Sequence, residues 1–465
     1  MTTDNPRPAL GNTPSGGPIQ VFFAKPGSAR KPRIVRGEGL YMWDDTGRRY
    51  IDVSSGPVAN NLGHGNARVL AAMQRQAEAV AFAYPTLFET EANIALADLL
   101  TSLAGPGLER AFFVSGGSEA TESALKFCRQ LALSRGEPER CKIIGRDPGY
   151  HGATLGALSV TGDYLQLEVF GALLREMPKI PAPFTYRLPP NHTCESYARH
   201  CAQALEAQII SEGPETVLAF IMEPIGGLAT GALVAEDIYY SMVRDICTRY
   251  GILLIYDEVM SGAGRSGKFL AADHWPQARP DLVILAKGIA AGYTPMGCVL
   301  VSAEMVNSVA EAGGFMHGFT YFANPLSCAI GHAVLTELVE HDLMNNAAAR
   351  GAELKARLQA IAAESAIVGD VRGLGLLLAV ELVADKESKR QLPLELVAPS
   401  RFQAIALEQG LAVYSRRTAG GRFGDWFMVS PPLTVSSEQV EEIAQGLAKA
   451  LRSYEEELAG QGVLD

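Results

Sequence analysis

Polar residues follow the strongly apolar runs of this sequence, and several of them are residue types that do chemistry. Lys287 ends the run DLVILAK, Asp257 and Glu258 follow GILLIY, and Glu223 follows VLAFIM. The run ERAFFV leads into the turn SGGS at positions 115–118. Such runs are typical of buried β-strands, and ligands of open α/β sheets bind beyond the carboxyl ends of the strands. We therefore expect these side chains to meet at one edge of a sheet.

The turn at positions 115–118 has features of an anion site. Gly116 and Gly117 stand before a helical segment, so backbone N–H groups and the positive end of a helix can approach a phosphate, while Ser118 adds a hydroxyl. The alternative is a tight turn in which Ser118 only caps the helix. The turn matches neither the P-loop ending Gly-Lys-Ser/Thr nor the pattern GxGxxG.

Lys287 and the Asp257-Glu258 pair each allow two interpretations. A lysine at a strand end commonly just reaches solvent, whereas a desolvated lysine has a lowered pKa and forms Schiff bases. The two carboxylates fit a metal site or a buried ion pair, but no spacing supplies further oxygen ligands, and we expect no metal. Together, a phosphate turn, a carboxylate for a ring nitrogen and a lysine for an aldehyde describe one ligand, pyridoxal 5'-phosphate (PLP).

The elements that must position these residues alternate between strand and helix. From about residue 65, short apolar runs are separated by helical segments such as SEATESALKFCRQLALSRG, which predicts a mostly parallel central sheet flanked by helices. Gly37–Gly56 reads as two short strands around a turn, and a long helical stretch follows Pro325. We expect an N-terminal arm and part of a small α/β domain in 1–64, a large PLP-binding domain in 65–335, and the rest of the small domain in 336–465.

Composition narrows the class of protein and its partners. The net charge of −11 argues against a nucleic-acid surface or an anionic membrane, and no apolar run approaches the length of a membrane span. The seven cysteines are scattered, form no CxxC and are odd in number, which favours a reducing, cytoplasmic location. The polar N-terminus lacks the apolar core of a signal peptide.

Seven motifs in one order resemble the class III PLP-dependent aminotransferases, the ω-aminotransferase group of fold type I. The motifs are GPVANNLGHGN, FFVSGGSEATESALK, GYHGATLGALSVTG, IMEPIGG, LLIYDEVMSGAGRSGKF, LAKGIAAGYTPMG and HGFTYFANPLSCA. The resemblance extends from Arg33 to about residue 450. It implies a fold type I PLP-dependent transferase with a smaller α/β domain built from both ends of the chain.

The resemblance implies two catalytic residues within a larger cofactor-binding set. Lys287 would carry the Schiff base, and Asp257 would pair with the pyridine nitrogen. The cofactor-binding set would be Gly116, Gly117, Ser118, Tyr150, His151, Glu223, Asp257, Val259, Lys287 and Thr320. For His151, a core histidine bonded to backbone is the alternative. Thr320 would reach the phosphate from the other subunit, so the resemblance implies a homodimer with a shared active site.

The resemblance also indicates where the substrate would lie. Substrate candidates are Pro57, Val58, Phe82, Tyr84 and Tyr150, together with the segment RRTAGGRFGDW. Related enzymes bind the substrate carboxylate with a mobile arginine near this segment. Arg422 stands closest to that position, Arg416 or Arg417 could serve instead, and a surface arginine in a glycine-rich loop is the alternative.

The implied reaction is ping-pong amino transfer. An amine or ω-amino acid would give its nitrogen to PLP, leaving pyridoxamine phosphate, and a keto acid such as pyruvate or 2-oxoglutarate would take it. Other PLP reactions, namely decarboxylating transamination, aminomutation or racemisation, share the same cofactor residues. A non-catalytic cofactor-binding protein and a metal-dependent hydrolase built on Asp257 and Glu258 are alternatives from other classes.

Overall fold

Seven strands form the central sheet of the computed structural model, which describes residues 31–421 and 423–464. Their order across the sheet is β4 (Arg110–Val114), β10 (Gly297–Val301), β9 (Leu282–Ala286), β8 (Leu253–Asp257), β7 (Val217–Met222), β5 (Lys142–Asp147) and β6 (Lys179–Pro181). β10 runs antiparallel to both of its neighbours, and the other paired strands are parallel. The predicted mostly parallel sheet is confirmed, and β8 and β9, which end near Asp257 and Lys287, are neighbours.

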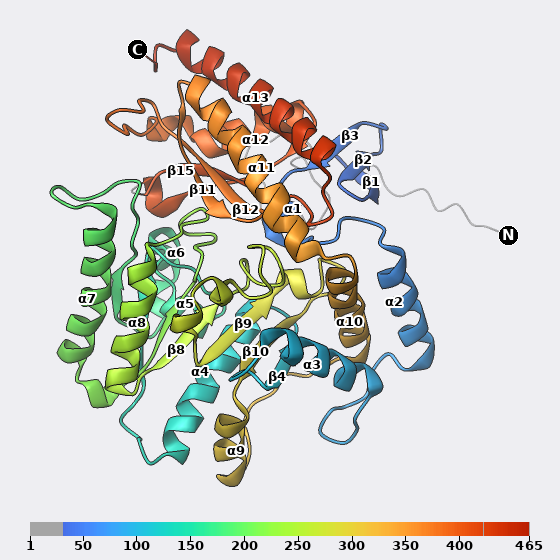
Figure 1. Cartoon of the computed structure of the whole chain (residues 1–465), viewed down its shortest axis with the longest axis vertical. Coiled ribbons are helices and arrows are strands. Elements are labelled where there is room, and N and C mark those ends of the chain that lie inside the picture. Colours follow the sequence, from blue (N-terminus) through green and yellow to red (C-terminus); the bar gives the residue numbers. More distant parts are fainter. Residues whose placement is uncertain (1–30, 422, 465) are drawn as a thin grey trace.

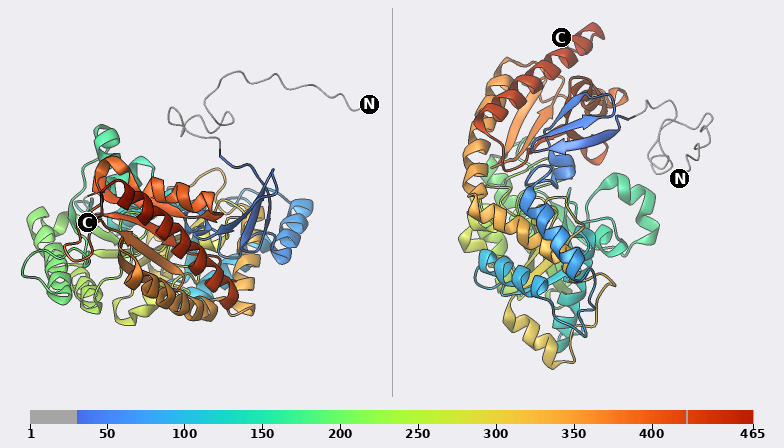
Figure 2. Two further views of the ribbon diagram at one scale, coloured as in Figure 1. Left: turned by 90° about the horizontal axis from the view of Figure 1, so that it is seen from above. Right: turned by 90° about the vertical axis from the view of Figure 1, so that its right-hand side faces the viewer.

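Helices cover both faces of this sheet (Figures 1 and 2). Their bounds are α2 (Ala67–Ala79), α3 (Glu91–Ala104), α4 (Gly117–Ser134), α5 (Leu155–Val160), α6 (Tyr164–Phe170), α7 (Cys194–Glu212), α8 (Asp237–Tyr250), α9 (Ala303–Glu311) and α10 (Pro325–Glu340). Successive residues of a strand point to opposite faces. In β9, Val283 and Leu285 accordingly join a core shared with α7, α8 and α10, while Leu282 and Ile284 pack with α4. Burial on both faces explains why the strand is apolar throughout.

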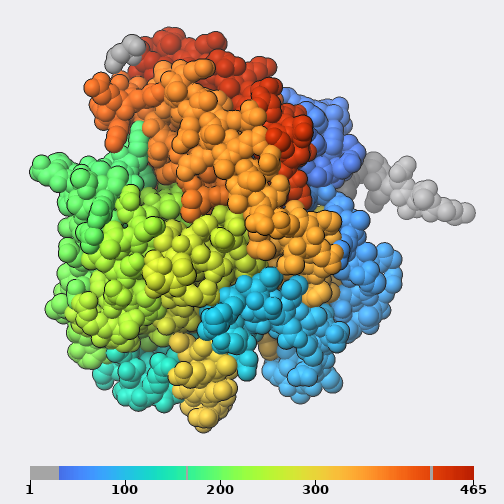
Figure 3. Space-filling model, in the orientation of Figure 1, coloured from blue at the N-terminus to red at the C-terminus, as the bar shows by residue number. Residues whose placement is uncertain are grey.

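The remaining strands form two smaller sheets. One has the order β1 (Ile34–Glu38), β2 (Tyr41–Asp44), β3 (Arg49–Asp52) and β13 (Leu411–Ala412), and the other has β11 (Val368–Leu374), β12 (Leu377–Leu382), β15 (Asp425–Val429) and β14 (Tyr414–Arg417). Three helices, α11 (Leu343–Glu364), α12 (Ala398–Glu408) and α13 (Ser437–Gly460), come from the same C-terminal part of the chain as β11–β15. Leu411 pairs with Ile51 in parallel register, so segments from both ends of the chain share one sheet. Figure 3 shows these blue and orange-to-red segments side by side.

Local sequence signals explain several element ends. The helical stretch predicted after Pro325 is two helices, because Asp342 adopts a left-handed conformation (φ +51°) between α10 and α11. α10 begins where the Asn324 side chain accepts a hydrogen bond from the Ser327 N–H and Pro325 takes the first helical position. The division of the chain at residues 64 and 335 stays a prediction, and the second boundary falls inside α10.

No helix within the described ranges is both long enough and apolar enough to span a bilayer.

Candidate active site

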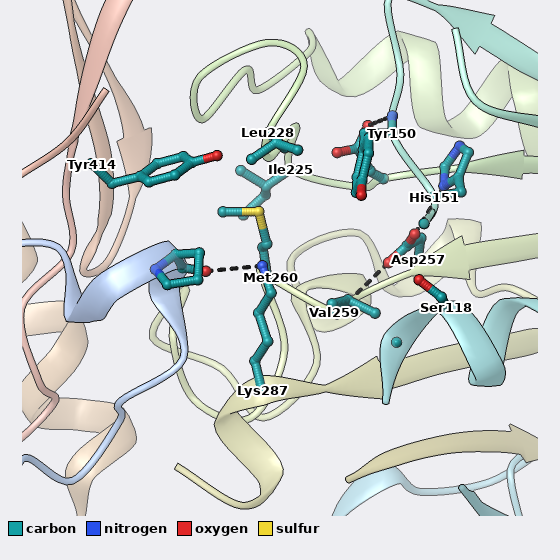
Figure 4. Close-up of a pocket in the computed structure, with 14 residues that line it drawn as sticks. Ser118, Tyr150, His151, Ile225, Leu228, Asp257, Val259, Met260, Lys287 and Tyr414 are labelled. Carbon is teal, nitrogen blue, oxygen red and sulfur yellow. Dashed lines mark hydrogen bonds and ion pairs between the residues drawn. The ribbon is translucent and has the colours of Figure 1, made fainter. Parts of the chain in front are cut away.

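A cavity of about 340 Å³ lies where β7, β8 and β9 end and α4 begins (Figure 4). The side chains that do chemistry lie on one side of it, and apolar side chains complete its wall. The lining residues are Pro57, Gly117, Ser118, Tyr150, His151, Gly152, Glu223, Ile225, Leu228, Asp257, Val259, Met260, Lys287 and Tyr414. Residues separated by more than 350 positions therefore meet at the carboxyl edge of the sheet, as the strand-end rule predicts.

Lys287 extends into this cavity from the turn that ends β9. Its φ of +46° lies in the left-handed region, which redirects the chain out of the strand. The ammonium Nζ donates a hydrogen bond to the Pro57 carbonyl oxygen at 2.9 Å (Figure 4). Burial lowers the pKa of Lys287 to about 8, and the nearby carboxylates of Asp257 and Glu223 oppose this shift. The amine is thus available as a nucleophile near neutral pH.

Asp257, the last residue of β8, is fixed by hydrogen bonds to both of its carboxylate oxygens. His151 Nδ1 lies 2.8 Å from Oδ2, and the Val259 N–H donates to Oδ1 at 3.0 Å. Both side chains are buried. His151 is held in turn by its own backbone, whose N–H donates to Thr161 Oγ1 at 2.9 Å. His151 therefore fixes the orientation of the Asp257 carboxylate.

Glu223, the residue after β7, forms another part of the polar wall. Its Oε1 accepts the Gly227 N–H at 2.9 Å, and its Oε2 accepts the Tyr150 N–H at 3.3 Å. Arg146 lies behind it and donates to the Glu223 carbonyl oxygen at 2.6 Å. Burial raises the pKa of Glu223, while the charges of His151 and Arg146 partly offset that effect.

The turn before α4 is closely packed at Gly117 and against the neighbouring strand β10. A Cβ on Gly117 would lie 3.2 Å from Val259 Cγ1, and a Cβ on Gly297 of β10 would lie 2.3 Å from the Gly116 carbonyl oxygen. Ser118 points its Oγ toward the Gly152 loop, where it accepts the Ala153 N–H at 3.0 Å. The first turn of an 18-residue helix and a hydroxyl thus face the cavity together, an arrangement that suits a phosphate.

The cavity has the groups that PLP requires. An amine for the aldehyde, a carboxylate for the ring nitrogen and a helix N-terminus for the phosphate all line it, and Tyr150 and Val259 offer an aromatic and an aliphatic surface for a flat ring. Of the set that the family resemblance implied, Gly117, Ser118, Tyr150, His151, Glu223, Asp257, Val259 and Lys287 line the cavity, and Gly116 caps the adjoining helix. Thr320 does not line it and is exposed.

The substrate candidates are scattered in this single chain. Pro57 lines the cavity, but Val58 is 1% exposed and belongs to the hydrophobic core. Phe82 and Tyr84 are exposed and make edge contacts with Tyr321 and Phe322 rather than with the cavity. Arg422 lies outside the described residues.

The two other candidate arginines, Arg416 and Arg417, are successive residues of β14 and therefore point to opposite faces of that strand. Arg417 faces away from the cavity and forms a two-pronged pair with Asp425, with Nε and Nη2 at 2.6 and 2.8 Å from the carboxylate oxygens. Arg416 shares the opposite face with Tyr414, which lines the cavity. Its guanidinium carbon lies 5.9 Å from the centre of the Tyr150 ring.

Sequence reasoning missed five residues of the wall: Ile225, Leu228, Met260, Gly152 and Tyr414. The first three follow the motif residues Glu223 and Val259 closely, so proximity to a motif was the available signal. Tyr414 had no such signal, because its position depends on the pairing of β14 with β15.

Glu258 takes no part in the cavity. Its side chain points into the protein, where Oε1 accepts the Ala272 N–H at 2.8 Å and Oε2 accepts the Ala271 N–H. Burial raises its pKa to about 8. Across residues 31–421 and 423–464, no group of three or more His, Cys, Asp or Glu side chains is placed to hold a metal ion.

The sheet order, the lysine after β9 and the aspartate that ends β8 define the class of protein as fold type I PLP-dependent enzymes. The family profile described as aminotransferase class-III matches residues 24–451, and the chain belongs to this family. The predicted family and its amino-transfer activity are confirmed, and the family uses PLP.

Known relatives resemble the chain over nearly its whole length. An uncharacterized aminotransferase of Bacillus subtilis, YodT, is 36% identical over 95% of this chain and 99% of its own. A putrescine–pyruvate aminotransferase of Pseudomonas aeruginosa is 32% identical over 90% of each chain. The solved structure of an amine transaminase from an uncultivated Pseudomonas species, in its PLP-bound form, is 35% identical, covers 95% of this chain and 98% of its own, and superposes with a TM-score of 0.86.

Proposed function

We propose that this aminotransferase moves an amino group from a primary amine or ω-amino acid to a keto acid such as pyruvate, with PLP bound in the cavity at Lys287. The observation that carries the proposal is the meeting of the Lys287 amine, the Asp257 carboxylate and the Gly116–Ser118 turn around one cavity. The names of two relatives, a putrescine–pyruvate aminotransferase and an amine transaminase, support the choice of donor and acceptor.

The residues assigned to PLP each have a physical reason. Gly116, Gly117 and Ser118 would hold the phosphate, Tyr150 and Val259 would flank the ring, and Asp257 would keep the ring nitrogen protonated. Bound PLP supplies an aldehyde that accepts the donor nitrogen and an electron-withdrawing ring, and pyridoxamine phosphate carries that nitrogen between the two halves of the reaction.

Lys287 would also move the proton. Its pKa of about 8 leaves a sizeable neutral fraction near neutral pH, so Nζ can take a proton from the donor carbon. Its flexible stem and its one hydrogen bond, to the Pro57 carbonyl oxygen, allow Nζ to shift within the cavity. His151 and the Val259 N–H hold the two oxygens of Asp257 and would keep the carboxylate directed at the ring nitrogen.

The cavity wall suits an amine donor. Ile225, Leu228, Met260 and Tyr414 form its apolar side. Within the described part of the chain, Lys287 is the only lysine or arginine that lines the cavity. A carboxylate on the donor would have no other cation in the wall to pair with, so a donor without a carboxylate fits the cavity better. For the keto acid, Arg416 is the carboxylate partner that we propose, because it shares the face of Tyr414.

We also propose a homodimer in the cytoplasm, with Thr320 completing the partner's phosphate site. Exposed apolar side chains surround that residue in sequence and support an interface there: Met316 is 90% exposed and Tyr321 63%. Leu87 and Phe88, beside the candidates Phe82 and Tyr84, are exposed as well. All seven cysteines are free thiols, which suits a reducing compartment.

Lys287→Ala tests the assignment. The wild-type protein with PLP should absorb in the visible range, bleach with an amine donor and transfer labelled nitrogen to pyruvate. We expect Lys287→Ala to lose the absorbance and at least 10³-fold of kcat, about 4 kcal/mol of barrier.

A matched control is Lys179→Met. Burial lowers the pKa of Lys179 to about 8 as well, but its Nζ donates to the Ser159 and Met177 carbonyl oxygens outside the cavity. Normal absorbance in Lys287→Ala, or its loss in folded Lys179→Met, would show that the assignment is wrong.

A further inference from the structure

Arg416 is held beside the cavity by an ion pair with Asp163. Its Nη2 donates to Asp163 Oδ2, and its guanidinium lies next to the Tyr150 ring. Tyr414, two residues earlier on the same face of β14, forms the cavity wall (Figure 4). Since Tyr150 and Tyr414 both line the cavity, the guanidinium lies directly behind the cavity wall.

Asp163 depends on this arginine. Its side chain is 3% exposed, and among the described side chains its other hydrogen bond is a long one, from Gln166 Nε2 at 3.4 Å. Asp163 precedes α6, yet its side chain makes no capping hydrogen bond to that helix. Taking Arg416 away would leave a buried carboxylate with little compensation, which is costly.

We propose that Asp163 is a positioning residue that sets the balance between neutral and carboxylate-bearing substrates. A substrate carboxylate must compete with Asp163 for the one guanidinium on the cavity side of β14, whereas a neutral amine or aldehyde leaves the ion pair intact. The inference rests on the proposed function and adds a determinant of substrate class to it. Since an arginine binds a carboxylate in the same two-pronged geometry that it uses for aspartate, the two are direct competitors.

The test is the variant Asp163→Asn, which keeps the side-chain volume and removes the charge. With the holoenzyme, we expect the KM for pyruvate to fall about tenfold, the size of one charge-assisted hydrogen bond. The KM for propanal, an acceptor of similar size without a carboxylate, should stay unchanged. Calorimetry with propanoate, which cannot react, should show the same rise in affinity and thus reports binding alone.

Two controls isolate the pair. Asp425→Asn releases Arg417 on the opposite face of the same strand and should leave the pyruvate-to-propanal ratio of KM unchanged. In an Arg416→Met background, adding Asp163→Asn should have no further effect, because the competing guanidinium is absent. If Asp163→Asn does not fold, Asp163→Ser removes the same charge with a small polar side chain.

Some results would overturn the inference. An unchanged or higher KM for pyruvate in the folded variant, or an equal fall for propanal, shows that Asp163 does not compete with the substrate carboxylate. These results differ from a failure of the proposed function, which would appear in the wild-type protein as missing visible absorbance or no transfer of nitrogen.

Discussion

Lys287 adopts a backbone conformation that is unusual for a lysine. A left-handed φ of +46° costs a non-glycine residue roughly 1–2 kcal/mol. The surrounding structure compensates, because β9 is locked between β8 and β10 and the next residues begin a short 3₁₀ turn, Lys287–Ile289. The strain turns the side chain out of the sheet and into the cavity, as is common for residues that react.

The lowered pKa of Lys287 predicts how the apoprotein takes up its cofactor. Only the neutral amine attacks the aldehyde, so the rate at which visible absorbance appears on adding PLP should rise with pH and level off above about 8. An ordinary lysine would level off about two units higher, near pH 10.4. Stopped-flow absorbance across pH 6.5–10.5 measures this midpoint, and one near 10 would contradict the burial argument.

For single residues, the rule that ligands bind beyond the carboxyl ends of strands was enough to find Lys287, Asp257 and Glu223, because apolar runs show where strands end. Val58 could not be placed this way. Its burial arises from the turn at residues 55–58, where Ser55 and Val58 both have positive φ. Nothing in the composition of that turn indicates such a conformation. The roles of the cavity residues stay predictions until variants are measured.

The antiparallel strand β10 shapes the turn at Gly116–Ser118. It lies between β4 and β9, and Gly297 at its start pairs with Val114 and Ala286. The carbonyl oxygen of Gly116 occupies the place where a Gly297 side chain would be. One glycine thus holds the end of β4, and with it the start of α4, against the centre of the sheet.

Gly297→Ala should therefore weaken PLP binding. A Cβ placed 2.3 Å from the Gly116 carbonyl oxygen forces the turn to move, and we expect the Kd for PLP to rise at least tenfold, about 1.4 kcal/mol. Absorbance titration of the apoprotein measures the change. Gly171→Ala is the control, because an added Cβ meets nothing within 4 Å there and the glycine has a helical φ of −54°. Equal affinities in the two variants would contradict the packing argument.

The sequence predicted the strands and helices of the large sheet well, since their hydrophobic periodicity is strong. It did not predict that β10 is antiparallel, because a strand's direction leaves no trace in its composition. The break at Asp342 was missed for a related reason: the residues on both sides continue the helical pattern, and only the left-handed φ of Asp342 interrupts it.

At the scale of the whole molecule, Arg265 joins distant parts of the chain. Its guanidinium donates to Asn61 Oδ1 at 2.7 Å, to the Leu376 carbonyl oxygen at 3.2 Å and to the Pro431 carbonyl oxygen. Among the described residues, no carboxylate forms a hydrogen bond with this buried side chain, and burial lowers its pKa to about 9. It ties the segment after β8 to residues beside β12 and β15 through two backbone acceptors, and to Asn61 through a side-chain acceptor.

Arg265→Met should destabilise the protein. Three buried acceptors lose their donor, which we expect to lower the free energy of unfolding by about 3 kcal/mol and the melting temperature by roughly 3 °C for a chain of this length. Calorimetry of the holoenzyme measures the shift. Arg199→Met, which removes an exposed pair with Glu195 within α7, should change stability by less than about 0.5 kcal/mol. Equal melting temperatures would contradict the role given to Arg265.

The pairing of β3 with β13 has a consequence for how the protein is made. Leu411 must be synthesised before Ile51 finds its strand partner, and Tyr414 comes three residues later. At a synthesis rate of about 5–20 residues per second, the ribosome needs roughly 20–70 s to cover that interval. During this time the edge of β3 that pairs with β13 is open to other chains, and once residue 287 has been made, Lys287 is present with one wall of its cavity missing. We therefore expect β3 to need shielding from other chains until then, and the cavity at Lys287 to close only near the end of translation.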